Sequence, residues 1–316
     1  IEKGMAIVSG IEQGIYAEVE KNIDFEVVSE LSQGERYYKQ KMNVEELRKD
    51  AEKGEYFSYM AGTASYMKEH YCIGGGVKIT LKQMDLPMKR GLSSSAAICV
   101  LVVKAFSKIY QLNLSTLDIM QAAYQGEQRT PSRCGRLDQA CAFGTKLVLM
   151  RFDGMDIEVK RLLVRGDFYW VFANLNASKD TIRILADLGK CYPFAEDEKE
   201  KNVQFALGKK NQEIVQKAIV YFEQGDAQAM GELMQEAQKV FDEYIAPACP
   251  EQLIAPVLHS VLNDPVVKKL VYGAKGVGSQ GDGTVQFLAK DREAQGKLIK
   301  YLREERRMDA YSFTIQ

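Results

Sequence analysis

Apolar and polar residues follow one another in short alternating runs, which predict β-strands, and in longer runs with helical spacing. Alternating and β-branched residues predict strands near residues 5–8, 14–20 and 24–30. Asn43-Val-Glu-Glu is a helix start signal, and the stretch from there to about Tyr71 is predicted to be mostly helical. Because strands and helices mix without regular βαβ alternation, the pattern predicts an α+β fold.

The remainder of the chain continues this mixture, and its composition shifts near residues 154–166. A length of 316 residues suggests two domains, predicted here as residues 1–160 and 161–316. Helices are predicted up to about Tyr110, after a cap at Ser115, over 196–245 and over 291–304. Further strands are predicted at 77–81, 146–150, 168–173, 270–272, 284–289 and 311–315.

Composition and charge exclude several classes of function. With 42 Lys and Arg against 43 Asp and Glu, the net charge of −1 gives no reason to expect a nucleic-acid partner. Two histidines are too few for a His-rich metal site, and six cysteines without a Cys-x-x-Cys pair indicate reduced thiols. No apolar run reaches the ~18–20 residues of a membrane span and no signal peptide is visible, so we expect a cytoplasmic protein without a membrane partner.

The strongest chemical signal is Gly91-Leu-Ser-Ser-Ser-Ala-Ala97, where three hydroxyls stand at the entry to a predicted helix. The first turn of a helix has unpaired N–H groups and a positive dipole end, and this geometry binds phosphate. Gly91 lets the backbone approach an anion closely, and serine hydroxyls can bond phosphate or Mg²⁺. The alternative is an N-cap with extra serines, which the flanking Pro87 and the Ala-Ala pair disfavour.

A second signal is the loop Gly276-Val-Gly-Ser-Gln-Gly-Asp-Gly283, with four glycines in eight residues between two predicted strands. Such a loop can close over a phosphate, although a long hairpin turn explains it equally well. It is not a Walker loop, because the Gly-Lys-Ser/Thr ending is absent. Asn176 and Lys179 follow another predicted strand, where contact with a substrate is the less favoured interpretation.

The third signal is a pair of carboxylates, Glu127 and Asp138. Phosphoryl transfer needs a metal ion to neutralise phosphate charge and a carboxylate to accept the proton of the attacking hydroxyl. Arg129, Arg133 and Arg136 crowd the same stretch and could keep an aspartate ionised or contact phosphate. Spacing alone does not separate this pair from ordinary surface carboxylates.

Together these motifs resemble the GHMP kinase superfamily, whose central motif is Pro-x-x-x-Gly-Leu-Gly-Ser-Ser-Ala-Ala. Here it stands as Pro87-Met-Lys-Arg-Gly-Leu-Ser-Ser-Ser-Ala-Ala97, with Ser93 replacing one glycine. The late glycine motif matches Gly276–Gly283 more loosely. The resemblance covers nearly the whole chain from Met5 onward. The family's first motif should precede Gly4, and the chain opens on Ile1 without an initiator Met, so we expect residues upstream to be missing.

The resemblance implies a fold and a set of roles. The fold would pair an N-terminal domain like ribosomal protein S5 domain 2 with a ferredoxin-like C-terminal domain, with MgATP in the cleft between them. Asp138 would be the catalytic aspartate, and Ser94 and Glu127 would bind Mg²⁺. The ATP and phosphate contacts would come from Gly91, Leu92, Ser93, Ser94, Ser95, Ala96, Gly276 and Gly278.

The implied activity is ATP-dependent phosphorylation of a hydroxyl group on a small metabolite. The Asp-Gln pair at 138–139 and the Ser-Ser-Ser run favour a sugar, as in sugar-1-kinases, over mevalonate, which is the second choice. A sensor that binds sugar and ATP without turnover, and a decarboxylase of the same superfamily, stay open. The sequence also leaves a homodimer open.

Overall fold

Two compact units make up the chain, and each is described by itself. The computed structural model describes residues 4–11, 13–29, 36–85, 94–131, 135–154 and 156–315. The first unit runs from Val8 to Thr145, and the second joins Ile1–Ile7 to Lys146–Gln316. The contacts therefore divide the chain near residue 145, whereas the sequence predicts a boundary at 160; the two named domains stay predictions. Over the described residues, no helix has the length and apolar character needed to cross a membrane.

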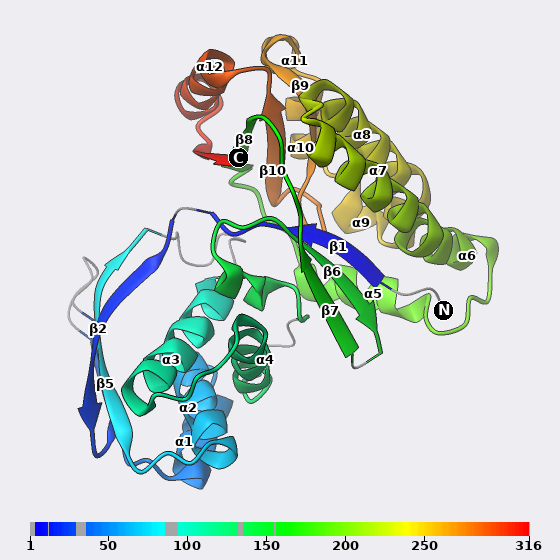
Figure 1. Ribbon diagram of the computed structural model, residues 1–316. Coiled ribbons are helices and arrows are strands. Elements are labelled where there is room, and N and C mark those ends of the chain that lie inside the picture. The colour runs from blue at the N-terminus through cyan, green and yellow to red at the C-terminus, as the bar shows by residue number, and fades with distance from the viewer. Residues whose placement is uncertain are drawn as a thin grey trace. The chain divides into compact units, whose positions relative to one another are not determined.

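The first unit contains a four-stranded sheet with the order β2-β5-β3-β4. Strand β3 runs parallel to β5, while β2 and β4 each pair antiparallel with their neighbour. Figure 1 shows the long strands β2 and β5 side by side. The strands are β2 (Ile15–Asn22), β3 (Phe25–Ser29), β4 (Arg36–Gln40) and β5 (Gly76–Met84).

Among the residues that the structure describes, five helical segments accompany this sheet. They are α1 (Val44–Glu52), α2 (Ser58–His70), α3 (Ser94–Tyr110), α4 (Thr116–Glu127) and the short 3₁₀ helix η1 (Asp138–Phe143). Phe106 of α3 stacks on Phe25 of β3 with ring centroids 6.0 Å apart, so α3 and the sheet share a core. The predicted caps are confirmed: Asn43 caps α1, and Ser115 with Asp118 forms a capping box on α4.

Two glycines let α2 and α4 approach each other at backbone distance. An added Cβ at Gly126 would lie 2.5 Å from Cα and Oγ1 of Thr63, and one at Gly62 would lie 2.6 Å from the Gly126 carbonyl oxygen. The neighbouring atoms are backbone or buried, so they cannot move aside. These two glycines therefore fix the distance between the helices, and with it the position of the end of α4.

We expect Gly126→Ala to destabilise the first unit by about 1–3 kcal/mol, because the new methyl group overpacks this contact. Urea or thermal unfolding measures the loss. Gly296→Ala is the matched control: Gly296 also lies in a helix, but an added Cβ there meets nothing within 4 Å. This control should be neutral or slightly stabilising, since alanine favours helix over glycine. Equal stability of the two variants would contradict the close helix contact.

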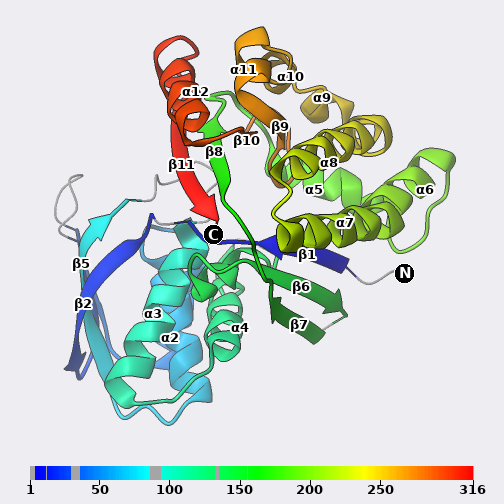
Figure 2. The same cartoon turned by 45° about the horizontal axis from the view of Figure 1, so that its top comes forward.

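The second unit is built on a four-stranded antiparallel sheet with the order β11-β8-β10-β9. Its strands are β8 (Phe168–Asn174), β9 (Val271–Gly276), β10 (Thr284–Ala289) and β11 (Asp309–Ile315). In chain order this is the 4-1-3-2 arrangement of a ferredoxin-like fold. Helix α12 (Arg292–Glu304) packs on the sheet through Leu298 and Leu302, which share a core with Val171 and Phe287. Figure 2 shows α12 beside β8 and β11.

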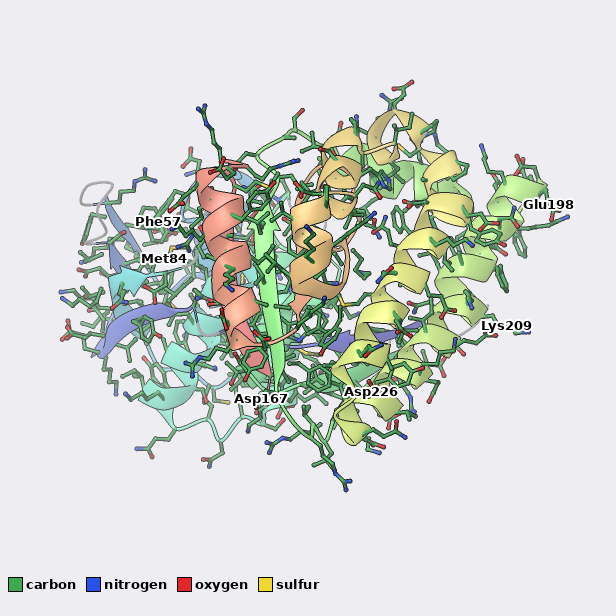
Figure 3. The ribbon with its side chains drawn as sticks, turned by 90° about the horizontal axis from the view of Figure 1, so that it is seen from above. Phe57, Met84, Asp167, Glu198, Lys209 and Asp226 are labelled. Atoms are coloured by element: carbon green, nitrogen blue, oxygen red, sulfur yellow. The ribbon has the colours of Figure 1, made fainter. Side chains whose placement is uncertain are left out.

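Additional helices separate β8 from β9. Figure 3 shows α7 and α8 side by side, with Asp226 marking the turn between them. A small three-stranded sheet of order β1-β6-β7 completes this part of the chain. Its strands are β1 (Gly4–Val8), β6 (Val148–Asp153) and β7 (Asp156–Arg161). The helices are α5 (Thr181–Lys190), α6 (Glu198–Phe205), η2 (Ala206–Lys210), α7 (Asn211–Gln224), α8 (Ala227–Val240), η3 (Phe241–Ile245), η4 (Ala246–Ala248), α9 (Pro250–Leu253), α10 (Pro256–Leu262) and α11 (Pro265–Leu270).

Candidate active site

The serine motif leads into the N-terminus of α3. Ser94 and Ser95 are the first two residues of this 17-residue helix, and Ala96 is fully buried behind them. Both serines are partly exposed, and the first amides of a helix have no partner within the helix. Gly91, Leu92 and Ser93, which are also predicted phosphate contacts, lie outside the described residues. The helix start therefore has the form that binds an anion, and the phosphate contacts themselves stay predictions.

The two candidate carboxylates belong to segments that one side-chain hydrogen bond connects. Glu127 is the last residue of α4 and is 1% exposed. Its Oε2 accepts a hydrogen bond of 2.7 Å from Nε2 of Gln139, a residue of η1 that is itself fully buried. Asp138 is the neighbour of Gln139 in sequence, opens η1 and is exposed. A buried carboxylate is thus held directly against the segment that presents an exposed one.

The pKa of the Cys141 thiol is influenced by the charged side chains of this region. Burial raises its pKa to about 12, and the negative charges of Asp138 and Glu127 add to this rise, while Lys104 opposes it. Lys104 extends from α3, where its Nζ lies 3.5 Å from the Ala142 carbonyl oxygen. The charges of Asp138, Glu127 and Lys104 therefore all act on the Cys141 thiol.

The connection between α3 and α4 explains this gathering. Only residues 111–115 separate the two helices, so they pack as an antiparallel pair, and α3 starts at the end where α4 finishes. Segment η1 packs against both. Ser94, Glu127 and Asp138 consequently belong to the same end of the helix pair. The sequence does not reveal this arrangement, because Glu127 and Gln139 are twelve positions apart and belong to different helical segments.

The donors at this end suit a magnesium ion that is shared with a phosphate ligand. In the part of the chain that the structure describes, no three His, Cys, Asp or Glu residues form a cluster able to hold a metal on their own. Mg²⁺ typically takes one or two protein carboxylates and completes its shell with phosphate oxygens and water. A carboxylate from Glu127 and a hydroxyl from Ser94 fit that pattern.

Contacts are described for two of the three arginines that the sequence places in this stretch. Arg129 forms an ion pair with Glu69 and donates a hydrogen bond of 2.8 Å to Ser65. Arg136 lies 5.6 Å from the centre of the Tyr124 ring, above α4. Arg133 lies outside the described residues, as does Cys134. Arg129 thus serves contacts among helices, whereas the sequence suggested a role at an aspartate or a phosphate.

The glycine loop of the second unit is organised around a lysine. Nζ of Lys179 donates to Oγ of Ser279 at 3.1 Å and to the Gln280 carbonyl oxygen at 3.0 Å. An added Cβ at Gly283 would lie 2.8 Å from Cε of the same lysine. Burial lowers the pKa of Lys179, and it also lowers that of Lys275, at the other side of the loop, to about 8.

This loop is therefore a built structure with two desolvated ammonium groups. Gly278 and Gly281 have φ of +60° and +66°, a conformation that favours glycine. The predicted phosphate contacts Gly276 and Gly278 belong to it and stay predictions. The sequence singles out Lys179 as a candidate for contact with a substrate, and its described hydrogen bonds are with the loop.

Comparison with known proteins agrees with these features. A sequence model of the GHMP kinases N terminal domain matches residues 58–145, which include α2, α3, α4 and η1. A galactokinase of Thermotoga petrophila is 28% identical over 284 residues, which are 82% of this chain and 78% of the relative. Residues 58–145 are therefore similar to the N-terminal domain of GHMP kinases, and most of the chain is similar to a galactokinase.

Solved structures show that this chain has the fold of GHMP kinases. A Lactococcus lactis galactokinase complexed with galactose superposes with a TM-score of 0.74 at 20% identity, covering 99% of this chain and 88% of the other. The mevalonate kinase of L. major in complex with R-mevalonate gives a TM-score of 0.69 at 20% identity, covering 99% of this chain and 90% of the other. The predicted α+β GHMP kinase fold is confirmed.

Proposed function

We propose that this chain is a GHMP kinase and transfers the γ-phosphoryl group of ATP to a hydroxyl group of a sugar. The observation that carries the proposal is the 2.7 Å hydrogen bond between Gln139 and Glu127, which joins a buried carboxylate to the segment that presents Asp138. Several relatives that share about a quarter of their residues with this chain are galactokinases, which favours a sugar as acceptor. Galactose is therefore the first acceptor to test.

Each candidate residue has a part in the transfer. The acceptor oxygen forms a bond to the γ-phosphorus while the bond from that phosphorus to the β–γ bridging oxygen breaks, and ADP leaves with the electron pair. Asp138 accepts the proton of the hydroxyl group. Ser94 and Glu127 would hold Mg²⁺, which neutralises phosphate charge when bound. The amides at the start of α3, at Ser94–Ala96, would bind phosphate oxygens.

A panel of acceptors tests this function. The purified protein is incubated with MgATP and, separately, galactose, other hexoses, sugar acids, heptoses and mevalonate, while ADP formation and ³¹P NMR spectra of the products are followed. We expect a sugar phosphate with at least one sugar. A phosphorylated mevalonate would replace the sugar proposal by the mevalonate alternative. Ligand-dependent thermal shifts without any product would instead identify a sensor, and release of CO₂ from a diphosphorylated acid would identify a decarboxylase.

A further inference from the structure

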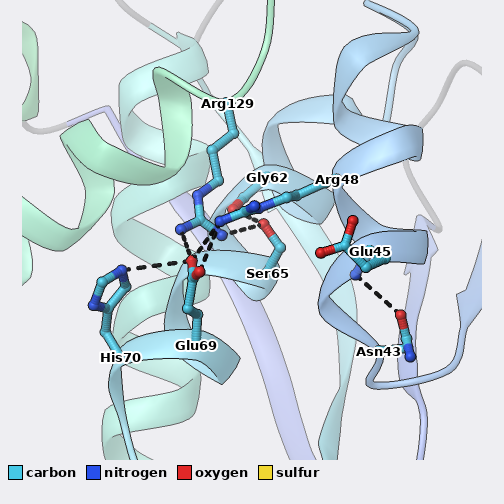
Figure 4. Close-up of polar contacts among 8 residues, drawn as sticks. All are labelled: Asn43, Glu45, Arg48, Gly62, Ser65, Glu69, His70 and Arg129. Atoms are coloured by element: carbon cyan, nitrogen blue, oxygen red, sulfur yellow. Dashed lines mark hydrogen bonds and ion pairs between the residues drawn. The ribbon is translucent and has the colours of Figure 1, made fainter.

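A cluster of charged side chains around Glu69 of α2 reaches the end of α4, and it holds neither of the two candidate carboxylates. Figure 4 shows its arrangement: Arg129, which follows α4, and Arg48 of α1 both point toward the carboxylate of Glu69 on α2. Arg48 donates to Oε1 and Oε2 of Glu69 at 2.8 and 2.7 Å. The Nε2 atom of His70 lies 3.5 Å from the same carboxylate.

Arg129 is the arginine of this cluster whose side chain is the more buried and the more restrained by contacts. Its side chain is 14% exposed, against 38% for that of Arg48. One guanidinium nitrogen bonds Glu69 and another donates 2.8 Å to Oγ of Ser65, whose hydroxyl in turn donates to the Gly62 carbonyl oxygen. The guanidinium also lies 5.1 Å from the centre of the Tyr66 ring. These contacts hold Arg129 against one face of α2.

The backbone around Arg129 carries Glu127. The N–H of Arg129 donates to the Gly126 carbonyl oxygen at 3.2 Å. Thr130 bonds the Glu127 carbonyl oxygen twice, with its N–H at 3.0 Å and its Oγ1 at 2.8 Å. The turn over residues 126–130 is thus a single hydrogen-bonded piece. When the Arg129 side chain is fixed to α2, the backbone of Glu127 is fixed with it.

We propose that the ion pair between Glu69 and Arg129 is a positioning device that sets the Glu127 carboxylate for metal binding. This inference rests on the proposed role of Glu127 in holding Mg²⁺. Glu127 has one anchor on its carboxylate, from Gln139, and a second one through the turn, from Arg129. Hydrogen bonds from Arg129, followed by those from Arg48, keep the pKa of Glu69 below its usual range, so the pair stays charged at neutral pH.

Metal affinity is the property that separates positioning from general stability. Loss of a partner that orients a metal ligand typically lowers metal affinity or activity by ~10–100-fold. We expect Arg129→Leu to raise the Mg²⁺ concentration needed for half-maximal phosphoryl transfer by about 10-fold. The kcat at saturating Mg²⁺ should change much less, because excess metal occupies a loosened site. Arg129→Lys, which keeps a cation beside Glu69 but loses the planar fork, should recover part of the affinity.

Arg48→Leu is the matched control. It removes a cation from the same carboxylate, but Arg48 belongs to α1, and its described hydrogen bonds go to Glu69 and not to the turn at 126–130. We expect this control to leave Mg²⁺ dependence within about twofold of the wild type, as for a surface pair of small net effect. Glu69→Gln should reproduce the Arg129→Leu shift in part, and the double variant should show less than the sum of the two.

The experiment combines kinetics with direct binding. Mg²⁺ activation curves are recorded for each variant, thermal unfolding is followed in parallel, and Mn²⁺ binding is measured by electron paramagnetic resonance with ATP present. A lower melting temperature of Arg129→Leu with unchanged metal dependence would overturn the inference, as would an equal shift in Arg48→Leu. If the wild type transfers no phosphate to any acceptor, the proposed function fails, while Mn²⁺ binding to wild type and variants still decides the positioning role.

Discussion

Asp138→Asn is expected to lower the rate of phosphoryl transfer by about 10²–10⁴-fold while ATP binding survives. Asparagine has nearly the same shape as aspartate but cannot accept the proton of the acceptor hydroxyl. Asp138 is exposed at the start of η1, so the substitution removes no buried contact and the fold should stay intact. Coupled measurement of ADP formation gives the rate, and calorimetric titration with ATP gives the affinity.

Asp156→Asn serves as the control for this prediction. Asp156 is an exposed aspartate of β7, outside the predicted site. Its replacement should leave both the rate and the ATP affinity close to those of the wild type. If Asp138→Asn turned over substrate as fast as the Asp156→Asn protein, Asp138 would not be the proton acceptor. Another residue would then have to accept the proton.

Glu127→Gln is expected to lower the rate at fixed Mg²⁺ by on the order of 10²–10³-fold, because a lost metal ligand removes several kcal/mol of charge stabilisation. Glutamine still offers an oxygen to Nε2 of Gln139, so the buried hydrogen bond is retained and the charge alone is lost. The loss should be accompanied by weaker Mn²⁺ binding in the presence of ATP. Weaker Mn²⁺ binding distinguishes Glu127→Gln from Asp138→Asn, because the metal binding of Asp138→Asn should be normal.

The control for Glu127 is Glu52→Gln, which neutralises an exposed glutamate at the end of α1 in the same unit. We expect no change in rate or in metal binding. Wild-type metal dependence in the Glu127→Gln protein would show that the buried carboxylate has a structural role only, and Mg²⁺ would then need another ligand.

Most regular elements could be predicted because their residues are half-buried and alternate accordingly. Strand β3, with alternate residues fully buried, and β8, with its buried Trp170, are examples. Strands β4 and β7 escaped prediction, since they lie at sheet edges and expose most of their side chains. The stretch over 43–71, predicted to be mostly helical, holds two helices, because the chain at Gly54 adopts φ of +69° and ends α1.

The residue types of the site could be predicted from the sequence, but the contacts between these residues could not. Ser94, Glu127 and Asp138 were chosen from motifs, and the structure brings Glu127 and the Asp138 segment together. The contact between Gln139 and Glu127 depends on the packing of η1 against two helices, which no local pattern encodes. The sequence singles out Arg129 for its charge, but it does not identify the partner Glu69, which lies sixty positions earlier in the chain. Such a partner is determined by helix packing alone.

The pairing of β1 with β6 has a consequence for the order in which the protein is made. The two ends of the first unit meet, since Gly10 N–H donates to the Gly144 carbonyl oxygen at 3.0 Å and Ser9 Oγ to that of Thr145 at 3.2 Å. Residues 8–145 can thus close on themselves without β6. The apolar strand β1 can pair with β6 only after β6 leaves the ribosome, which is on the order of 10 s after β1 itself, at ~5–20 residues per second. During that interval its unpaired edge is open to chaperones and to other nascent chains.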